Sequence, residues 1–278
     1  MQRAPKLTLN NGVMIDQAGF GTYKVPAEDA AALVTSALEL GYRHIDTAAL
    51  YGNEEGVGEA VRNFTDTGHM VREDLFLTSK LWNTDQGYDA AFRAFDASMD
   101  RLGTGYLDLY LIHWPCPARG LFVETYRALE EIYASGRVRA IGVSNFRRED
   151  LEELLSATGI VPAVNQIELH PWLAQEKLRA FHAANGIRTV AWSPLGRGAV
   201  LADPVITAIA AELGRTPAQV VLRWHVQAGS IVIPKASSED RITGNLDLFS
   251  FDLDDAQLAA IHSLDRGHRV GSEPSEVN

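Results

Sequence analysis

The chain has one cysteine, no long apolar run and no excess of positive charge. Because Cys116 stands alone, no internal disulfide can form, which suits a reducing cytoplasm. Apolar runs extend over only a few residues, so we expect neither a signal peptide nor a membrane span. The formal net charge of -11 argues against nucleic acid as a partner. These features predict a cytoplasmic protein that binds neither membranes nor nucleic acid.

Several catalytic and nucleotide-binding motifs are also missing. Residues 56–61 come close to G-x-G-x-x-G, but they lie inside a predicted helix. The chain has eight histidines, which invites comparison with metal-dependent barrel hydrolases. It has neither a His-x-His pair nor H-E-x-x-H, however, so we predict no metal site and a structural role for Glu168 and His170. The Tyr-x-x-x-Lys pair of short-chain dehydrogenases is absent too.

What the chain does have is a regular alternation of predicted strands and helices. A small hairpin with an Asn-Gly turn is predicted over residues 6–15. Extended segments follow at 19–21, 43–47, 75–80, 107–113, 138–144, 163–168, 188–193 and 230–235. Helical segments follow them at 28–40, 54–63, 89–102, 122–134, 149–156, 175–184 and 239–249, and after the seventh strand at 204–213 and 217–228, which together form one broken unit. One more helix is predicted over 254–264, and residues 266–278 are predicted to be an irregular tail.

Eight strands, each followed by a helix, predict a closed (β/α)8 TIM barrel with an N-terminal β-hairpin and an extra C-terminal helix. Strands that alternate with helices form a parallel sheet with right-handed crossovers. An open doubly wound sheet is the main alternative, but it usually has fewer strands and a glycine-rich first turn. No linker-like or low-complexity stretch interrupts the sequence, so we expect residues 1–278 to form a single domain.

Four polar residues follow or end predicted strands, namely Asp46, Tyr51, Lys80 and His113. In such a barrel, catalytic groups gather at the carboxyl ends of the strands. A free phenol has a pKa near ~10, so it donates its proton reluctantly at neutral pH. We expect the Lys80 ammonium, held by Asp46, to lower the pKa of Tyr51 toward working pH, and His113 to hydrogen-bond the same substrate oxygen. The set indicates proton transfer to a carbonyl oxygen while a hydride reaches the carbon.

Each of these residues, taken alone, also has an ordinary structural explanation. Asp46 can cap a helix, and Tyr51 can pack in a turn. Lys80 can be a solvated strand end, and His113 can be a hydrogen-bonded core histidine. Four such positions after three separate strands weaken the ordinary explanation, although spacing alone does not prove that they converge.

Long stretches of the chain resemble the aldo-keto reductase family. They are residues 41–48 (GYRHIDTA), 51–54 (YGNE), 80–82 (KLW), 107–115 (LDLYLIHWP), 141–146 (IGVSNF) and 165–171 (NQIELHP). The resemblance runs nearly end to end and implies the barrel, NADPH/NADP+ as cofactor and reversible carbonyl reduction. It places the family's catalytic tetrad on Asp46, Tyr51, Lys80 and His113. Tyr51 would be the general acid, Lys80 and Asp46 its tuning pair, and His113 the group that orients the carbonyl.

The resemblance also implies contacts with the nicotinamide half of the cofactor. Ser144, Asn145 and Gln166 match the residues that bind the carboxamide, and amide side chains offer the donor and the acceptor that it needs. Trp192 stands where the family stacks an aromatic ring on the nicotinamide, although a strand residue of this kind can also be core packing. Further cofactor contacts are implied at Gly21, Thr22, Ser193 and Leu195.

Residues 234–245 resemble the family's clamp for the adenosine 2′-phosphate. The clamp positions fall on Lys235, Ser237, Arg241 and Asn245. The lysine and arginine supply positive charge, and the asparagine matches the adenine contact; the two cations can also be solvated surface residues. Ala236 replaces a usual serine and Gly244 a usual glutamate, with Ser237 or Ser238 able to supply the lost hydroxyl. These departures concern how strictly NADPH is preferred over NADH, not cofactor use itself.

Three aromatic residues are predicted to line the substrate pocket. Tyr23, Trp82 and Trp114 flank tetrad strands or the first barrel loop, although they can also pack at the rim. Such a pocket suits small ketones, aldehydes and dicarbonyls. The chain most resembles the bacterial 2,5-diketo-D-gluconate reductase branch, and we expect a monomer with a small carbonyl substrate. Some relatives are cofactor-sensing subunits of membrane proteins, but a complete tetrad favours turnover.

Overall fold

The computed structural model describes residues 4–278. A two-stranded antiparallel hairpin, β1 (Lys6–Thr8) and β2 (Met14–Asp16), comes first. Eight parallel strands then form one sheet in the order β10-β9-β8-β7-β6-β5-β4-β3. They are β3 (Phe20–Gly21), β4 (His44–Asp46), β5 (Phe76–Leu81), β6 (Leu109–Ile112), β7 (Ile141–Ser144), β8 (Val164–Glu168), β9 (Arg188–Trp192) and β10 (Ile231–Val232).

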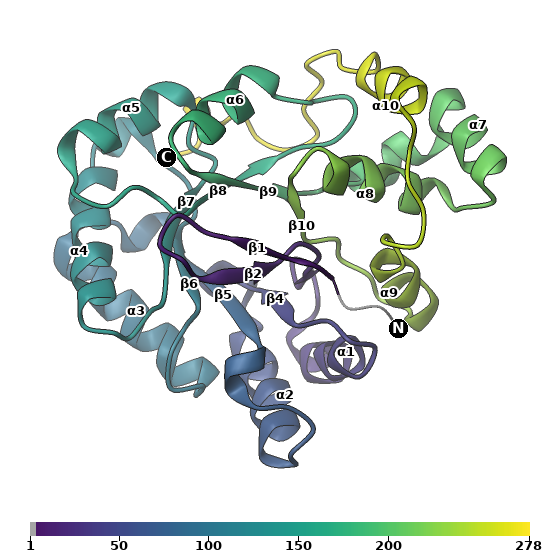
Figure 1. Cartoon of the computed structure of the whole chain (residues 1–278). Helices are drawn as coiled ribbons and strands as arrows, with labels where there is room; N and C mark the ends of the chain where they lie inside the picture. Colours follow the sequence, from purple (N-terminus) through teal and green to yellow (C-terminus); the bar gives the residue numbers. More distant parts are fainter. Residues whose placement is uncertain (1–3) are drawn as a thin grey trace.

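Helices surround this sheet (Figure 1). They are α1 (Ala27–Glu39), α2 (Glu54–Asp66), α3 (Tyr88–Leu102), α4 (Phe122–Ala134), α5 (Arg148–Ala157), α6 (Glu176–Ala184), α7 (Pro204–Leu213), α8 (Pro217–Gln227), α9 (Glu239–Leu246) and α10 (Asp255–His262). The predicted extra C-terminal helix is α10. The predicted segments 204–213 and 217–228 correspond to α7 and α8, and the break between them arises because Gly214 ends α7 in a left-handed conformation and Thr216 caps α8.

The first and last strands of the sheet meet and close the barrel. Gly19 donates its N–H to the Val232 carbonyl at 2.8 Å, and Gly21 donates to the Pro234 carbonyl at 3.2 Å. A Cβ atom on Gly21 would lie 2.6 Å from the Ile233 carbonyl oxygen, so this close approach requires glycine. The predicted (β/α)8 barrel is therefore confirmed.

The hairpin closes one end of the barrel. Leu9 and Ile15 are buried in the same apolar cluster as the inward-facing Phe76, Leu109 and Val164. The hairpin strands lie across the centre of the barrel in Figure 1. Since apolar side chains fill this end, the barrel interior is open to solvent at the carboxyl ends of the strands, where polar chemistry is expected.

Residues 266–278 do not form an α-helix, but they are not a free tail. From α10 the chain returns across the barrel and ends on the α5 side of the view (Figure 1). Near its end, the Asn278 side chain accepts a hydrogen bond from the backbone N–H of Ala118 at 2.8 Å. Within residues 4–278, no helix combines the length and the apolar character that crossing a membrane requires.

Candidate active site

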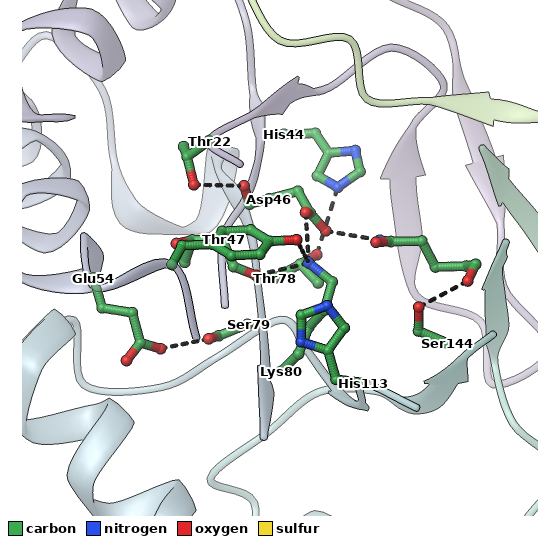
Figure 2. Close-up of polar contacts among 12 residues, drawn as sticks. Thr22, His44, Asp46, Thr47, Glu54, Thr78, Ser79, Lys80, His113 and Ser144 are labelled. Carbon is green, nitrogen blue, oxygen red and sulfur yellow. Dashed lines mark hydrogen bonds and ion pairs between the residues drawn. The ribbon is translucent and has the colours of Figure 1, made fainter. Parts of the chain in front are cut away.

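A buried ion pair lies at the centre of the site. Asp46 is the last residue of β4, and Lys80 lies in the neighbouring strand β5. The Lys80 Nζ atom is 2.6 Å from Asp46 Oδ1 and donates to the Thr47 carbonyl at 2.8 Å (Figure 2). Both side chains are almost completely buried. Lys80 is therefore neither solvated nor at the end of its strand, which excludes the ordinary explanation for it.

Tyr51 and His113 complete the predicted group of four. The Tyr51 hydroxyl lies 3.4 Å from Lys80 Nζ, and its ring meets the His113 ring edge-on with centroids 5.7 Å apart. His113 follows β6 and is buried, and its Nδ1 atom has no partner within the described part of the chain. The structure thus brings all four residues together, although they come from three separate barrel units.

Burial controls the protonation of these groups. It raises the pKa of Tyr51 well above 10.0, and the charges of Asp46 and Tyr23 act in the same direction. It lowers the pKa of His113 well below 6.5, assisted by the Lys80 charge. Burial also lowers the pKa of Lys80, and the Asp46 carboxylate opposes this shift because it stabilises the charged ammonium. At neutral pH the site therefore holds a protonated phenol and a neutral imidazole.

The expectation that Lys80 lowers the pKa of Tyr51 toward working pH is wrong for this structure. Burial, which desolvates the phenolate, is the largest cause of the rise in the Tyr51 pKa, and the negative charge of Asp46, which pairs with the Lys80 ammonium at 2.6 Å, acts in the same direction. Tyr51 keeps its proton over a wide pH range, which a proton donor requires.

The residues predicted to bind nicotinamide lie in the same cavity. This cavity, about 300 Å³ in volume, is lined by Asp46, Tyr51 and His113 and, among the predicted cofactor contacts, by Gly21, Ser144, Asn145, Gln166, Trp192, Ser193 and Lys235. Gln166 donates its amide N–H to Asp46 Oδ2 at 2.8 Å, which ties the carboxamide set directly to the tetrad. Ser144 donates to the Gln166 carbonyl at 2.8 Å (Figure 2).

The other predicted cofactor residues lie outside this cavity. Thr22 is buried behind it and donates to the Asp46 carbonyl at 3.1 Å, and Leu195 packs against apolar core residues. Ser237 precedes α9, and Arg241 and Asn245 lie in that helix. Arg241 is exposed, as an arginine that binds a phosphate from solvent would be, whereas Asn245 is buried.

Aromatic and aliphatic side chains form the outer wall of the cavity. Tyr23, Trp82 and Trp114 line it as predicted, and Tyr23 is 44% exposed at the rim. Lining residues that sequence reasoning missed are Leu50, Pro194, Arg197, Ile233, Ser272 and Val277. The last two belong to the segment predicted to be a simple tail, whose lack of periodicity gave no signal of a role in the site.

Glu168 explains how that segment is held. This buried carboxylate accepts hydrogen bonds from the backbone N–H groups of Val270 at 2.5 Å and Gly271 at 3.0 Å. It also pairs with His170 at 2.9 Å and with Arg269 at 3.5 Å. The structural role predicted for Glu168 and His170 is therefore confirmed. Within residues 4–278, no group of three or more His, Cys, Asp or Glu side chains is arranged to hold a metal ion.

Comparison with known proteins identifies the class of protein to which this barrel belongs. Residues 16–266 match the Aldo/keto reductase family. An aldo-keto reductase of Mycolicibacterium smegmatis is 55% identical over 99% of this chain and 98% of its own length. A glyoxal reductase of Bacillus subtilis is 47% identical over 97% of this chain and 96% of its own length.

A solved structure is also similar to this chain. A point mutant of Gox0644 in complex with NADPH superposes with a TM-score of 0.94 at 47% identity and covers 100% of both chains. The chain therefore belongs to the aldo-keto reductase family. It is an NADP-dependent oxidoreductase that uses NADPH/NADP+.

Proposed function

We propose that this chain reduces small aldehydes, ketones or dicarbonyls to alcohols with NADPH, and that Tyr51 donates the proton. The observation that carries the proposal is one cavity lined both by Tyr51 and His113 and by the amide and aromatic residues suited to nicotinamide, with the buried Lys80 ammonium 3.4 Å from the Tyr51 hydroxyl. When bound, NADPH supplies a hydride to the carbonyl carbon. The residues of the chain then have to bind the carbonyl oxygen and protonate it.

The ion pair prepares Tyr51 for this proton transfer. As the phenol loses its proton, negative charge develops on the oxygen 3.4 Å from Lys80 Nζ. A fixed ammonium beside that oxygen stabilises the developing charge without reorganising solvent. Asp46 and the Thr47 carbonyl hold the ammonium in place. Lys80 therefore acts during the transfer rather than by lowering the resting pKa of the phenol.

His113 supplies a second polar contact to the substrate oxygen. Because the imidazole is neutral at working pH, one ring nitrogen carries a proton that it can donate and the other does not. Its ring also meets the Trp82 indole edge-on at 5.2 Å, which fixes its plane. A neutral donor beside Tyr51 orients a carbonyl oxygen without competing as the proton source.

The residues of the cavity fit a nicotinamide ring with its carboxamide. Trp192 offers an aromatic face and is partly exposed to the cavity. Ser144, Asn145 and Gln166 place hydroxyl and amide groups beside it. Lys235 brings a positive charge to the same cavity, and Arg241 lies beyond it on α9, where an adenosine 2′-phosphate would reach.

We propose a small carbonyl compound with an apolar or aromatic part as the substrate. Tyr23, Leu50, Trp82, Trp114 and Val277 form an apolar outer wall that such a group can contact. The glyoxal reductase of Bacillus subtilis points to dicarbonyls as well. Neither of the two relatives described above is named a 2,5-diketo-D-gluconate reductase, so membership of that branch stays a prediction. We also propose that residues 1–278 act as one monomeric, cytoplasmic barrel domain.

A panel of carbonyl substrates tests this function. We expect NADPH-dependent turnover of phenylglyoxal and methylglyoxal, with a higher kcat/KM for phenylglyoxal because its ring contacts the aromatic wall. We expect NADH to be used less well, since it lacks the phosphate that Lys235 and Arg241 would bind. The measurement is the loss of reduced-cofactor absorbance with each cofactor. Tight NADPH binding without turnover of any carbonyl would instead favour a cofactor-sensing protein.

The pH dependence of the reaction provides a separate prediction. The active form needs a protonated Tyr51, a charged Lys80 and a neutral His113. The pKa of His113 lies below 6.5, so its protonation removes activity only at lower pH. The pKa of Tyr51 lies well above 10.0, whereas burial lowers the pKa of Lys80 from 10.5, so loss of the Lys80 ammonium sets the upper limit. We expect kcat/KM for phenylglyoxal to be nearly constant between these limits at saturating NADPH, and a tenfold change per pH unit within them would contradict the two assignments.

A further inference from the structure

The Trp192 indole is fixed at its nitrogen edge by a hydrogen bond. Its Nε1–H donates to Asn145 Oδ1 at 2.8 Å. The Asn145 amide in turn donates to the His113 carbonyl at 2.9 Å and to Ser144 Oγ at 3.0 Å. The plane of the indole is therefore coupled to the backbone beside the proposed oxygen-binding histidine.

The opposite edge of the indole meets the C-terminal segment at Gly271. A Cβ atom on Gly271 would lie 2.3 Å from Trp192 Cη2 and 2.8 Å from Glu168 Oε2. The backbone of Gly271 is not in the left-handed region, so its conformation does not require glycine. The indole requires it, because any side chain here would push the ring or the segment away.

Glu168 holds the segment against the indole. Glu168 and Trp192 are partners in the register of β8 and β9, so the carboxylate and the indole stand on adjacent strands. The carboxylate accepts the N–H groups of Val270 and Gly271, and it is fully buried. Hydrogen bonds to a charged, buried acceptor are stronger than neutral ones. These hydrogen bonds from the backbone to Glu168 therefore hold Gly271 in contact with Trp192.

We propose that Glu168 and Gly271 are positioning residues for the nicotinamide half of the cofactor. They set the plane of the Trp192 indole, and the indole sets the plane of the nicotinamide; this last step rests on the proposed function. Affinity for the nicotinamide half then depends on the C-terminal segment. Affinity for the adenosine half, which is proposed to bind near α9, does not.

The test compares two ligands on the same variants. NADPH contains the nicotinamide, whereas 2′,5′-ADP carries only the adenosine half. Overpacking at Gly271→Ala should raise the Kd for NADPH by about tenfold or more and leave the Kd for 2′,5′-ADP within about twofold, as measured by calorimetry. Glu168→Gln should produce the same selective loss by loosening the segment. Gly159→Ala is the matched control, since its Cβ would make only an ordinary contact at 3.7 Å with Glu130.

A double variant separates positioning from a general loss of stability. Trp192→Phe removes the Cη2 atom that an alanine at 271 would meet, so adding Gly271→Ala to it should weaken NADPH binding little further. Equal weakening of both ligands by Gly271→Ala and Glu168→Gln, or no weakening by either, would overturn the proposal. If Trp192→Ala leaves the Kd for NADPH unchanged, the proposed nicotinamide placement itself fails. If Trp192→Ala weakens NADPH binding and the two other variants do not, only the positioning role fails.

Discussion

Replacing Tyr51 with phenylalanine is expected to lower kcat for carbonyl reduction by about 10²–10⁴-fold. Phenylalanine keeps the ring that packs against Tyr23 and His113 but removes the proton that the carbonyl oxygen receives. Because the ring remains and the lost hydroxyl lies at the distant limit of hydrogen bonding to Lys80, we expect the Kd for NADPH and the Tm to change little. Steady-state kinetics with phenylglyoxal and a thermal melt provide the measurements.

A second tyrosine supplies the control for this substitution. Tyr88 lies in α3, is 37% exposed and packs against Phe92, away from the cavity. Tyr88→Phe should keep wild-type kcat. An active Tyr51→Phe enzyme would show that another group provides the proton. A Tyr51→Phe enzyme that has also lost NADPH binding would show a structural role instead.

Replacing Lys80 with methionine is expected to damage both stability and activity. The substitution leaves the Asp46 carboxylate buried without its cation, and removing one partner of a buried pair typically costs about 3–5 kcal/mol. It also removes the ammonium that stabilises the developing phenolate. We expect a fall in the free energy of unfolding of that size, together with a large loss of kcat. Denaturant unfolding and steady-state kinetics on the same preparation measure the two effects.

A double variant separates these two effects. Asp46→Asn combined with Lys80→Met removes both charges, and an asparagine oxygen can still accept the hydrogen bond from Gln166. We expect most of the lost stability to return, since no uncompensated charge remains buried. Activity should stay low because the ammonium is still missing. Recovery of activity along with stability would mean that the pair is only structural.

Much of the site could be predicted because its residues lie in short motifs at strand ends. Asp46, Lys80 and His113 each belong to a parallel strand or follow it directly, and barrel closure brings those ends to one face. The same geometry brings Gln166 within 2.8 Å of Asp46, although 120 positions separate them. Strand order therefore explains why these side chains meet at one face, whereas the assignment of the cofactor residues depended on the family resemblance.

Other features depend on contacts that no local pattern reveals. The C-terminal segment lacks periodicity, and Glu168 holds it through backbone N–H groups that any sequence offers. Gly271 is required by the indole of a residue 79 positions away, not by its own conformation. The pKa of Tyr51 was predicted in the wrong direction because burial is the largest cause of its shift and the Asp46 charge acts in the same direction, and sequence spacing shows neither the burial nor the approach of Asp46.

The most direct measurement is a single turnover of enzyme loaded with NADPH and mixed rapidly with phenylglyoxal. If Tyr51 delivers the proton, wild-type enzyme oxidises its bound cofactor in one fast phase, whereas loaded Tyr51→Phe enzyme keeps it reduced about 10²–10⁴ times longer. Oxidation at the wild-type rate by the loaded variant would contradict the assignment of Tyr51 as proton donor.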